Sequence, residues 1–535
     1  MKGLLKMNKN DPKKIYIFDT TLRDGAQSAN ISFSVRDKLQ IIDRFDDIGI
    51  DYVEVGFPAS NPKDDELFKQ LKKKKYNYSR IVSFGRTKYK NTPVQKDENL
   101  KALIDSGADA VCIFGKASSF HVEKVIETTL DNNLEMIFDS VKYLKENCPE
   151  VVYDAEHFFD GYKLDPGYAI KTLLAAQDAG SDFIVLCDTN GGCLPGEVLK
   201  ILGEVDEMIK APLGIHFHND SGCAVANSII SVERISGVKM VQGTINGYGE
   251  RCGNADLCQI IPSLEVKLGK LCLHEGNLKH ITNLSRYISE VANQTPINNQ
   301  PFVGRNAFAH KAGMHVHGVS KVSEAFEHIK PETVGNTREI LISELSGKKS
   351  IIIKAKEFGV NLEGDSKSVN RILNLIQNLE HKGYQFEAAE GSFELIVRGV
   401  IGAKKKFFTL ESFRVLNEKR MDGIMVSEAT VKLIVDKNRI IETAEGDGPV
   451  HALDCAIRKG LENFYPDLAK IKLSDFKVRV LDEKQGTAAV VRVLVESTDG
   501  VRSWGTIGVS ENIIEASWQA LEDSIVYGLM HLEEK

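Results

Sequence analysis

Apolar residues in the first half of the chain form short runs separated by amphipathic stretches. Short runs rich in Val, Ile and Phe are typical of buried strands, whereas apolar residues at helical spacing, as in 38–50 and 98–110, indicate helices. The strand-like runs are 15–21, 51–57, 80–85, 110–115, 151–159, 183–189, 213–220 and 240–247. Eight strand–helix units in this length predict a closed (β/α)₈ TIM barrel, with a doubly wound sheet as the alternative.

The pattern changes after the eighth strand. Helical stretches then surround a segment rich in His, Gly and Asn at 300–318. Further on, the pattern gives strands at 431–436, 439–444, 476–482 and 488–497, a turn at Trp504–Gly505, and helices at 450–461 and 510–529. We read this as a weak strand–strand–helix repeat. The predicted organisation is an α/β chain with a catalytic barrel at 9–278, a helical linker at 279–395 and a C-terminal α+β regulatory domain at 396–535.

Composition narrows the classes of function. The net charge of -7 gives no electrostatic reason to expect nucleic acid or an anionic membrane as a partner. The nine cysteines include no CxxC pair, which disfavours both a disulfide framework and a cysteine zinc site. The N-terminal MKGLLKMNKN is too short for a signal peptide, and no apolar run is long enough to cross a membrane. We therefore expect a cytoplasmic protein.

Polar side chains gather at the ends of the predicted strands, where barrel enzymes place their chemistry. They are Arg23 and Asp24 after the first strand, Glu156 in the fifth, Asp188 and Thr189 at the end of the sixth, His216, His218 and Asp220 at the end of the seventh, and Asn246 at the end of the eighth.

The motif His216-Phe-His218 is the strongest local signal. Residues i and i+2 of a strand face the same side, so both imidazoles point into one space. They could be two ligands of a divalent ion, or two histidines satisfied by hydrogen bonds. Asp24 favours the metal site over two hydrogen-bonded histidines. Strands 1, 7 and 8 are neighbours in a closed barrel, so Asp24 can reach the same point as the histidines. Asp24 with the two histidines would leave open positions for a chelating 2-oxo acid, and Asn254 could add a side-chain oxygen.

Three longer motifs carry a resemblance to a known family. DTTLRDGAQ (19–27), HFHND (216–220) and GYGERCGNAD (247–256) resemble the signature regions of the 2-isopropylmalate, homocitrate and citramalate synthase family, which is related to the hydroxymethylglutaryl-CoA lyases. The similarity covers nearly the whole chain. It implies a metal-dependent enzyme that joins acetyl-CoA to a 2-oxo acid.

The resemblance also implies roles for individual residues. Asp24, His216 and His218 match the metal ligands, with Asn254 at a fourth position, and the ion would be Mg²⁺ or Mn²⁺, with Zn²⁺ possible. Arg23 matches a catalytic arginine that stabilises charge on a substrate oxygen, and Gln27 and Thr189 match residues that contact the substrate. Glu156 and His315 match the pair that removes a methyl proton from acetyl-CoA. His310 and His317 are alternatives to His315.

Narrower motifs indicate the substrate and the assembly. ISFSVRDKL (31–39), LCDTNGG (186–192) and VGRNAFAHKAGMHVHGV (303–319) resemble the longer citramalate synthases, which condense acetyl-CoA with pyruvate to (R)-citramalate on a route to isoleucine. By contrast, Val55, Phe57 and Ala59 resemble the 2-isopropylmalate synthase version, which leaves that activity as the alternative. A hydroxymethylglutaryl-CoA lyase activity is a more distant one. The resemblance further implies a homodimer with an amino-acid feedback inhibitor, isoleucine by pathway logic.

Overall fold

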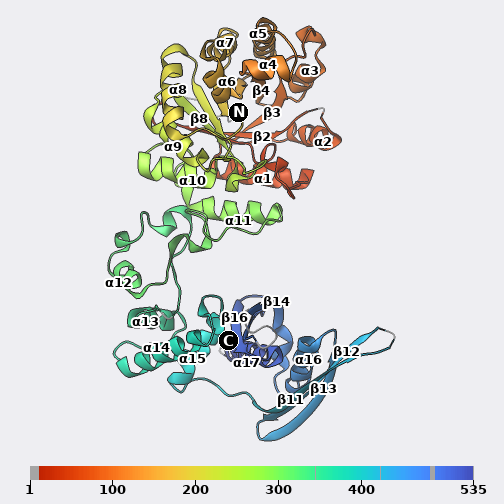
Figure 1. Cartoon of the computed structure of the whole chain (residues 1–535), viewed down its shortest axis with the longest axis vertical. Coiled ribbons are helices and arrows are strands. Elements are labelled where there is room, and N and C mark those ends of the chain that lie inside the picture. The colour runs from red at the N-terminus through yellow and green to blue at the C-terminus, as the bar shows by residue number, and fades with distance from the viewer. Residues whose placement is uncertain (1–10, 59, 344, 422, 482–488, 534–535) are drawn as a thin grey trace. The chain divides into compact units, whose positions relative to one another are not determined.

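The computed structural model describes residues 11–58, 60–343, 345–421, 423–481 and 489–533. The chain divides into two compact units, Met1–Phe308 with Ile329–Thr337, and Ala309–His328 with Arg338–Lys535 (Figure 1). The predicted domain boundaries near residues 279 and 396 stay predictions. Residues 1–10, on which the absence of a signal peptide was argued, lie outside the described part of the chain.

A closed barrel of eight parallel strands forms the first unit, as predicted. The strands are β1 (Tyr16–Asp19), β2 (Tyr52–Gly56), β3 (Arg80–Arg86), β4 (Ala110–Lys116), β5 (Val151–Glu156), β6 (Phe183–Asp188), β7 (Leu213–Phe217) and β8 (Val238–Gly243). Consecutive strands pair with each other, and β1 pairs with β8 to close the barrel. The doubly wound alternative is therefore excluded.

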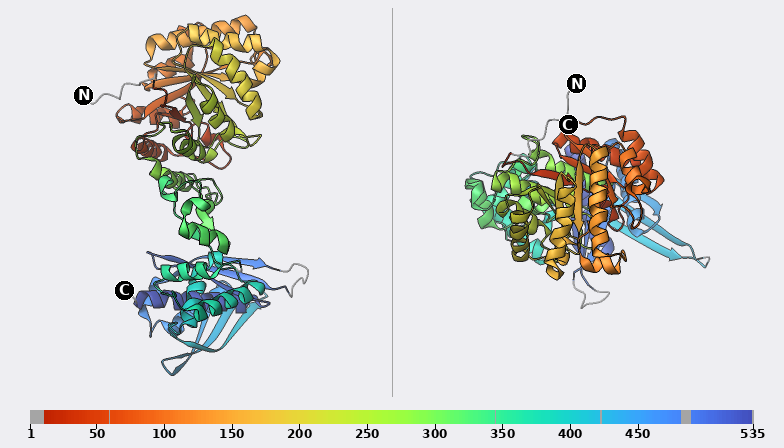
Figure 2. Two further views of the ribbon diagram at one scale, coloured as in Figure 1. Left: turned by 90° about the vertical axis from the view of Figure 1, so that its left-hand side faces the viewer. Right: turned by 90° about the horizontal axis from the view of Figure 1, so that it is seen from above.

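Helices surround the barrel strands, as the further views in Figure 2 show. They are α1 (Val35–Ile48), α2 (Pro62–Leu71), α3 (Glu98–Asp105), α4 (Ser119–Lys124), α5 (Leu130–Asn147), α6 (Phe158–Leu164), α7 (Pro166–Asp178), α8 (Pro195–Met208), α9 (Ala224–Arg234), α10 (Leu257–Pro262) and α11 (Ile281–Val291). Helix α1 illustrates the local determinants. Ser34 and Asp37 form a capping box at its start, and Gly49 ends it with a φ of 87°. A Cβ on Gly49 would lie 2.8 Å from His274.

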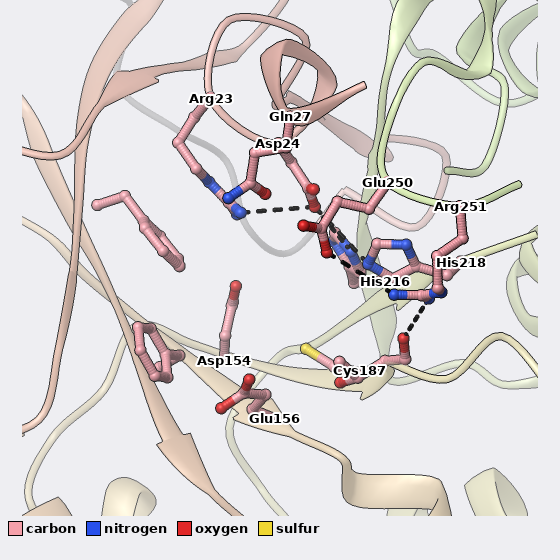
Figure 3. Close-up of a pocket in the computed structure, with 13 residues that line it drawn as sticks. Arg23, Asp24, Gln27, Asp154, Glu156, Cys187, His216, His218, Glu250 and Arg251 are labelled. Atoms are coloured by element: carbon pink, nitrogen blue, oxygen red, sulfur yellow. Dashed lines mark hydrogen bonds and ion pairs between the residues drawn. The ribbon is translucent and has the colours of Figure 1, made fainter. Parts of the chain in front are cut away.

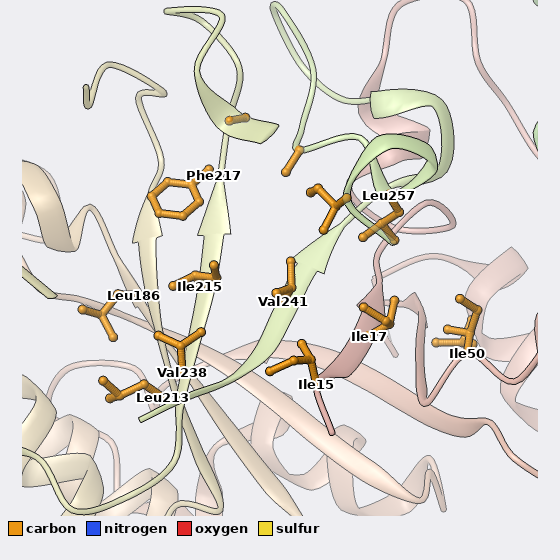
Figure 4. Packing of buried hydrophobic residues seen from close by; sticks show 14 of the residues in the cluster. Ile15, Ile17, Ile50, Leu186, Leu213, Ile215, Phe217, Val238, Val241 and Leu257 are labelled. Atoms are coloured by element: carbon orange, nitrogen blue, oxygen red, sulfur yellow. The ribbon is translucent and has the colours of Figure 1, made fainter. Parts of the chain in front are cut away.

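Two apolar layers follow from the alternation of side chains along each strand. Outward-facing residues such as Ile17, Ile215 and Val241 pack against the helices (Figure 4). Inward-facing residues such as Tyr52 and Val185 fill the lower part of the barrel interior. On β7, Ile215 and Phe217 belong to the outer layer, and His216 between them faces inward.

Three barrel strands end three or four residues earlier than predicted. The fifth strand ends at Glu156 rather than at residue 159, because His157 takes a left-handed φ of 58° and turns the chain into α6. The seventh strand ends at Phe217, so His218 comes just after it. The eighth ends at Gly243, and Asn246 lies in the following turn with a φ of 64°.

The second unit contains helices and two antiparallel sheets. Its helices are α12 (Gly313–Lys321), α13 (Lys348–Glu357), α14 (Ser366–His381), α15 (Glu390–Val400), α16 (Pro449–Leu461) and α17 (Ile513–Glu533). Its strands are β9 (Ala309–His310), β10 (Glu339–Ile340), β11 (Thr409–Lys419), β12 (Met425–Val435), β13 (Asn438–Gly446), β14 (Lys472–Val480), β15 (Val491–Thr498) and β16 (Ser503–Ser510).

The repeat in this unit is longer than predicted. Three strands precede each helix, giving β11–β12–β13–α16 and β14–β15–β16–α17. The prediction missed β11, whose side chains are largely exposed and only weakly alternating. Trp504 and Gly505 were predicted to form a turn, but they lie in β16, where Trp504 is buried against the core. Residues 482 and 488, at the edges of two predicted strands, lie outside the described part of the chain.

Candidate functional site

A pocket of about 260 Å³ opens at the carboxyl ends of the barrel strands. It is lined by Arg23, Asp24, Gln27, Phe84, Phe114, Asp154, Glu156, Cys187, Thr189, His216, His218, Glu250 and Arg251. Figure 3 shows Asp154 and Glu156 across the pocket from Asp24 and the two histidines. The structure thus brings together, around one space, every barrel residue predicted to bind substrate or act in catalysis, and three of the four predicted metal ligands.

Asp24, His216 and His218 form a cluster suited to a metal ion. Their candidate ligand atoms all lie within 4.8 Å of one another, and all three residues are buried. Asp24 Oδ2 lies 3.4 Å from Nε2 of His216 and 3.8 Å from Nε2 of His218. Burial disfavours the charged form of Asp24, but its neighbours, the Arg23 guanidinium foremost, outweigh burial and lower the carboxyl pKa. The carboxylate is therefore ready to bind a cation.

Both imidazoles are kept neutral. Burial, together with the neighbouring His218, lowers the pKa of His216 to about 4, and burial also lowers the pKa of His218. Only a neutral imidazole has a free lone pair for a metal. These residues therefore fit a divalent metal ion, as the sequence predicted, without indicating which ion it is.

Asn254 lies beside this cluster. Its backbone forms a bridge with His218, and its Nδ2 donates to the Tyr248 carbonyl oxygen at 3.0 Å. Oδ1 is buried and has no hydrogen-bond partner in the structure, which is the state expected of an available ligand oxygen. Gly249 permits this placement, because a Cβ there would lie 2.3 Å from the Asn254 amide nitrogen. Its φ of 158° also lies outside the range most residues adopt.

Arg23 is held on two sides. Its Nε donates to Oε2 of Glu54 at 2.6 Å, and its guanidinium carbon lies 3.8 Å from the centre of the Phe84 ring. Glu54 is fully buried on the inner face of β2 and also accepts from the Thr20 hydroxyl at 2.5 Å. The sequence reasoning missed Glu54, although a glutamate inside the apolar run YVEVG is itself a signal of a buried ion pair.

Glu156 ends β5 and forms an ion pair with Lys116, which ends the neighbouring strand β4. Next along the chain, the His157 amide donates to Oγ1 of Thr189 at 2.9 Å. The Thr189 hydroxyl oxygen thus has a donor, and its own proton remains to be donated. Lys116 was not predicted, although it is a polar residue at a strand end like the others.

Three strand-end residues predicted from the pattern do not line the pocket. The Asp188 carboxylate accepts from the Cys193 amide at 2.9 Å, and Asp220 pairs with Arg251. Asn246 donates to the Ser285 carbonyl oxygen at 2.9 Å and so joins the barrel to α11. These three residues stabilise the loops that follow β6, β7 and β8. Arg251 also donates to the Thr189 carbonyl oxygen at 2.7 Å, which ties the loops after β6, β7 and β8 together.

The linker histidines lie in the second unit. His310 is buried, and its Nε2 lies 3.1 Å from Oε1 of Glu327, a carboxylate that Arg338 also binds. His315, on α12, is exposed and stacks on the Phe326 ring at a centroid distance of 4.3 Å. His317 is exposed as well. His310 is thus held in an ion-pair network, and the catalytic role of His315 stays a prediction.

The barrel and its buried Asp–His–His cluster define a class of enzyme that uses a divalent ion at the carboxyl ends of barrel strands. Comparison with known proteins gives the family. Residues 14–288 match the HMGL-like family, 302–383 the homocitrate synthase post-HMGL domain-like family, and 387–529 the LeuA allosteric (dimerisation) domain. The chain belongs to the HMGL-like family, among the citramalate and 2-isopropylmalate synthases.

Individual relatives cover almost the full length. The chain is 52% identical to the (R)-citramalate synthase of Geobacter sulfurreducens over 97% of this chain and 98% of that protein. It is 49% identical to the (R)-citramalate synthase of Aquifex aeolicus, over 98% and 99%. Identity to the 2-isopropylmalate synthase of Methanocaldococcus jannaschii is 33%, over 97% and 95%. Across the described residues, every helix is too short or too polar to cross a membrane.

The lowered histidine pKa values predict metal binding that tolerates mild acid. Between about pH 7.5 and about pH 6, Mn²⁺ affinity should fall less than about fourfold, because His216 has no proton to lose and the pKa of His218 is lowered. Two histidines with ordinary pKa values would cost on the order of tenfold over the same interval. Isothermal titration calorimetry with Mn²⁺ at both pH values measures the difference, and a tenfold loss would contradict the assignment of neutral imidazoles.

Proposed function

We propose that this chain condenses acetyl-CoA with pyruvate and releases (R)-citramalate and CoA. The observation that carries the proposal is the Asp24–His216–His218 cluster at a small pocket, in a chain 52% identical to an (R)-citramalate synthase. The identity to a 2-isopropylmalate synthase is lower, 33%. A pocket of about 260 Å³ with Phe84 and Phe114 in its wall suits a small 2-oxo acid.

We assign Mg²⁺ or Mn²⁺ to Asp24, His216 and His218, with Asn254 as a fourth ligand and Zn²⁺ as the alternative ion. When bound, such an ion polarises a keto oxygen as a Lewis acid. The carboxylate of Asp24 and the amide oxygen of Asn254, with open positions for substrate oxygens, suit Mg²⁺ and Mn²⁺, whereas the two imidazoles also suit Zn²⁺.

The remaining pocket residues orient the 2-oxo acid. Arg23 keeps a fixed positive charge in the pocket, where Glu54 binds its Nε, Asp24 Oδ2 lies 3.5 Å from its Nη1 and Phe84 covers one face of the guanidinium. Its terminal N–H groups can then stabilise negative charge on the former keto oxygen. Thr189 can donate its hydroxyl proton to the carboxylate of the oxo acid, since its oxygen already accepts from the His157 amide. Gln27 lies in the pocket wall and can contact the same substrate.

Removal of a methyl proton from acetyl-CoA is assigned to Glu156 with His315. Lys116 keeps the Glu156 carboxylate paired with a positive charge at the pocket wall. The enolate carbon then attacks the keto carbon, the keto oxygen gains a proton, and water cleaves the thioester to release CoA. We propose that His315 reaches the barrel of a partner subunit, so that the active site is complete in a homodimer. The match to a LeuA allosteric (dimerisation) domain supports a dimer.

Val55 and Phe57, two of the residues that resemble the 2-isopropylmalate synthase version, lie outside the pocket lining. Val55 is buried in the outer apolar layer, and Phe57 packs edge-on against Phe84 at 6.1 Å between ring centroids. Ala59 lies outside the described residues. The 2-isopropylmalate synthase alternative therefore depends on Phe84 and Phe114, which line the pocket directly. The lyase alternative is weaker, because it would leave the domain at 387–529 without a role.

An assay of CoA release tests the proposed function. With Mn²⁺ and acetyl-CoA, free thiol should appear with pyruvate, more slowly with 2-oxobutanoate and not with 2-oxoisovalerate. His216→Ala should abolish turnover by removing a ligand. Release with 2-oxoisovalerate but not with pyruvate would show a 2-isopropylmalate synthase instead. Absence of release with every oxo acid, in metal-replete protein, would exclude the synthase activity.

Enlarging the pocket should change the substrate preference. Phe114→Ala removes a ring that stacks on Phe84 at 5.4 Å between centroids, and the space gained can accept a longer side chain. We expect kcat/KM for 2-oxobutanoate relative to pyruvate to rise by about tenfold, the usual value of one methylene in an apolar pocket. Phe138→Ala, which changes a partly buried ring on α5 outside the pocket lining, is the matched control. An unchanged ratio in Phe114→Ala would argue against this wall.

The linker histidines can be separated by paired substitutions on α12. His315→Ala should lower kcat by about 10²–10⁴-fold, the usual contribution of a positioned general base. His317→Ala, an equally exposed neighbour on the same helix, should leave kcat within about twofold of the wild-type value. The reverse result would transfer the role to His317. Equal activity in all three proteins would exclude both α12 histidines from the mechanism.

The regulatory assignment is proposed on the same basis. Isoleucine is the expected inhibitor, because the proposed product lies on the route to that amino acid. In the CoA-release assay, isoleucine should inhibit turnover, whereas leucine at the same concentration should not. Light scattering of the purified protein should give the mass of a dimer. Inhibition by leucine alone would instead fit the 2-isopropylmalate synthase alternative.

A further inference from the structure

A chain of hydrogen bonds crosses the barrel interior behind the metal cluster. Asp154 lies on β5, Gln242 on β8 and His216 on β7. Gln242 Nε2 donates to Oδ1 of Asp154 at 3.0 Å, and Gln242 Oε1 lies 2.9 Å from Nδ1 of His216. Asp154 and Gln242 are both buried, and their contact joins strands that are not neighbours in the barrel.

The Asp154 carboxylate fixes the direction of the Gln242 amide. An ionised carboxylate only accepts hydrogen bonds, so the amide nitrogen must face Asp154. The amide oxygen then faces His216, and because that oxygen can only accept, His216 must carry its proton on Nδ1. Nε2 is left with a free lone pair, and it is the atom that lies 3.4 Å from Asp24 Oδ2. The hydrogen-bond chain therefore selects the tautomer that a metal needs.

The position of these hydrogen bonds inside the barrel argues against a purely structural role for Gln242. Barrel interiors are usually filled by layers of apolar side chains, and the layer below, with Tyr16, Phe18 and Val185, follows that rule. A leucine at position 242 would continue it. Both polar atoms of the buried Gln242 amide are instead used, one for each neighbour, so the desolvation of the amide is offset only while both partners are present.

We propose that Gln242 is a positioning residue, anchored by Asp154, that sets the tautomer and the ring orientation of His216 for metal binding. This inference rests on the proposed metal site at Asp24, His216 and His218. Partners of this kind outside the ligand set commonly contribute tenfold to a hundredfold to metal affinity.

Metal titration of the full-length chain tests the proposal without relying on turnover. At about pH 8, where Asp154 is ionised, Gln242→Leu should weaken Mn²⁺ binding by about 10–100-fold in isothermal titration calorimetry. Gln177→Leu is the matched control, because Gln177 on α7 accepts from the Lys210 amide and does not line the pocket, and this variant should bind Mn²⁺ like the wild type. Thermal unfolding of the metal-free proteins compares their folded states.

Exchanging the side-chain types of Asp154 and Gln242 should restore the hydrogen bonds that Gln242→Leu removes. In the double variant Asp154→Asn/Gln242→Glu, the new amide can donate to the new carboxylate, which can still accept from His216 Nδ1. The net charge is unchanged, and Mn²⁺ affinity should return to within about fivefold of the wild-type value, well inside the loss expected for Gln242→Leu. If Gln242→Leu is poorly folded, the double variant alone tests the proposal. A Mn²⁺ affinity of the double variant below about a tenth of the wild-type value would then overturn the proposal.

The outcomes separate the inference from the proposed function. Mn²⁺ binding by Gln242→Leu at wild-type affinity would overturn the positioning role and leave the metal site intact. Failure of the wild-type chain to bind Mn²⁺ would overturn the metal site, and the positioning role with it. Weak binding by Gln242→Leu with recovery in the exchanged pair supports the positioning role.

Discussion

Pairing between β1 and β8 is the contact on which the site depends. The register places Phe18 opposite Gln242, and the next pair, β7 with β8, places His216 opposite the same glutamine. Asp24, just beyond β1, thereby reaches the histidines of β7 across one intervening strand. No single segment of the chain holds the cluster. Its geometry exists only when the barrel is closed, so metal binding and barrel folding are coupled.

The upper layer of the barrel interior is polar, and its charges are matched. Glu54 is paired with Arg23, and Glu156 with Lys116, while Asp154 accepts from an uncharged amide. Burial raises the pKa of Asp154 to about 7, which shows how strongly this environment disfavours an isolated charge. Each pair costs desolvation that an apolar layer would not. In the proposed function, these polar contacts orient a metal ion and an ionised oxo acid, which an apolar layer could not do.

The second unit uses different packing for a different purpose. Its two three-stranded sheets each precede a helix, and Trp504 and Trp518 contribute to a shared core. The same unit holds α12 with His315 and the match to a LeuA allosteric (dimerisation) domain. One unit therefore carries both a proposed catalytic residue and the proposed regulatory domain. In the proposed mechanism, a shift in this unit would change the supply of the general base directly.

The sequence by itself determined the barrel, the inward direction of the HxH motif and the participation of Asp24, because alternation and strand count are local properties of the chain. It misplaced the ends of three barrel strands by three or four residues, and the fifth of these strands ends where the left-handed residue His157 turns the chain into α6. It also gave no sign that Gln242 would meet Asp154 and His216. Such contacts depend on the register between strands distant in sequence, and that register is set by barrel closure and side-chain packing, which only the tertiary structure decides.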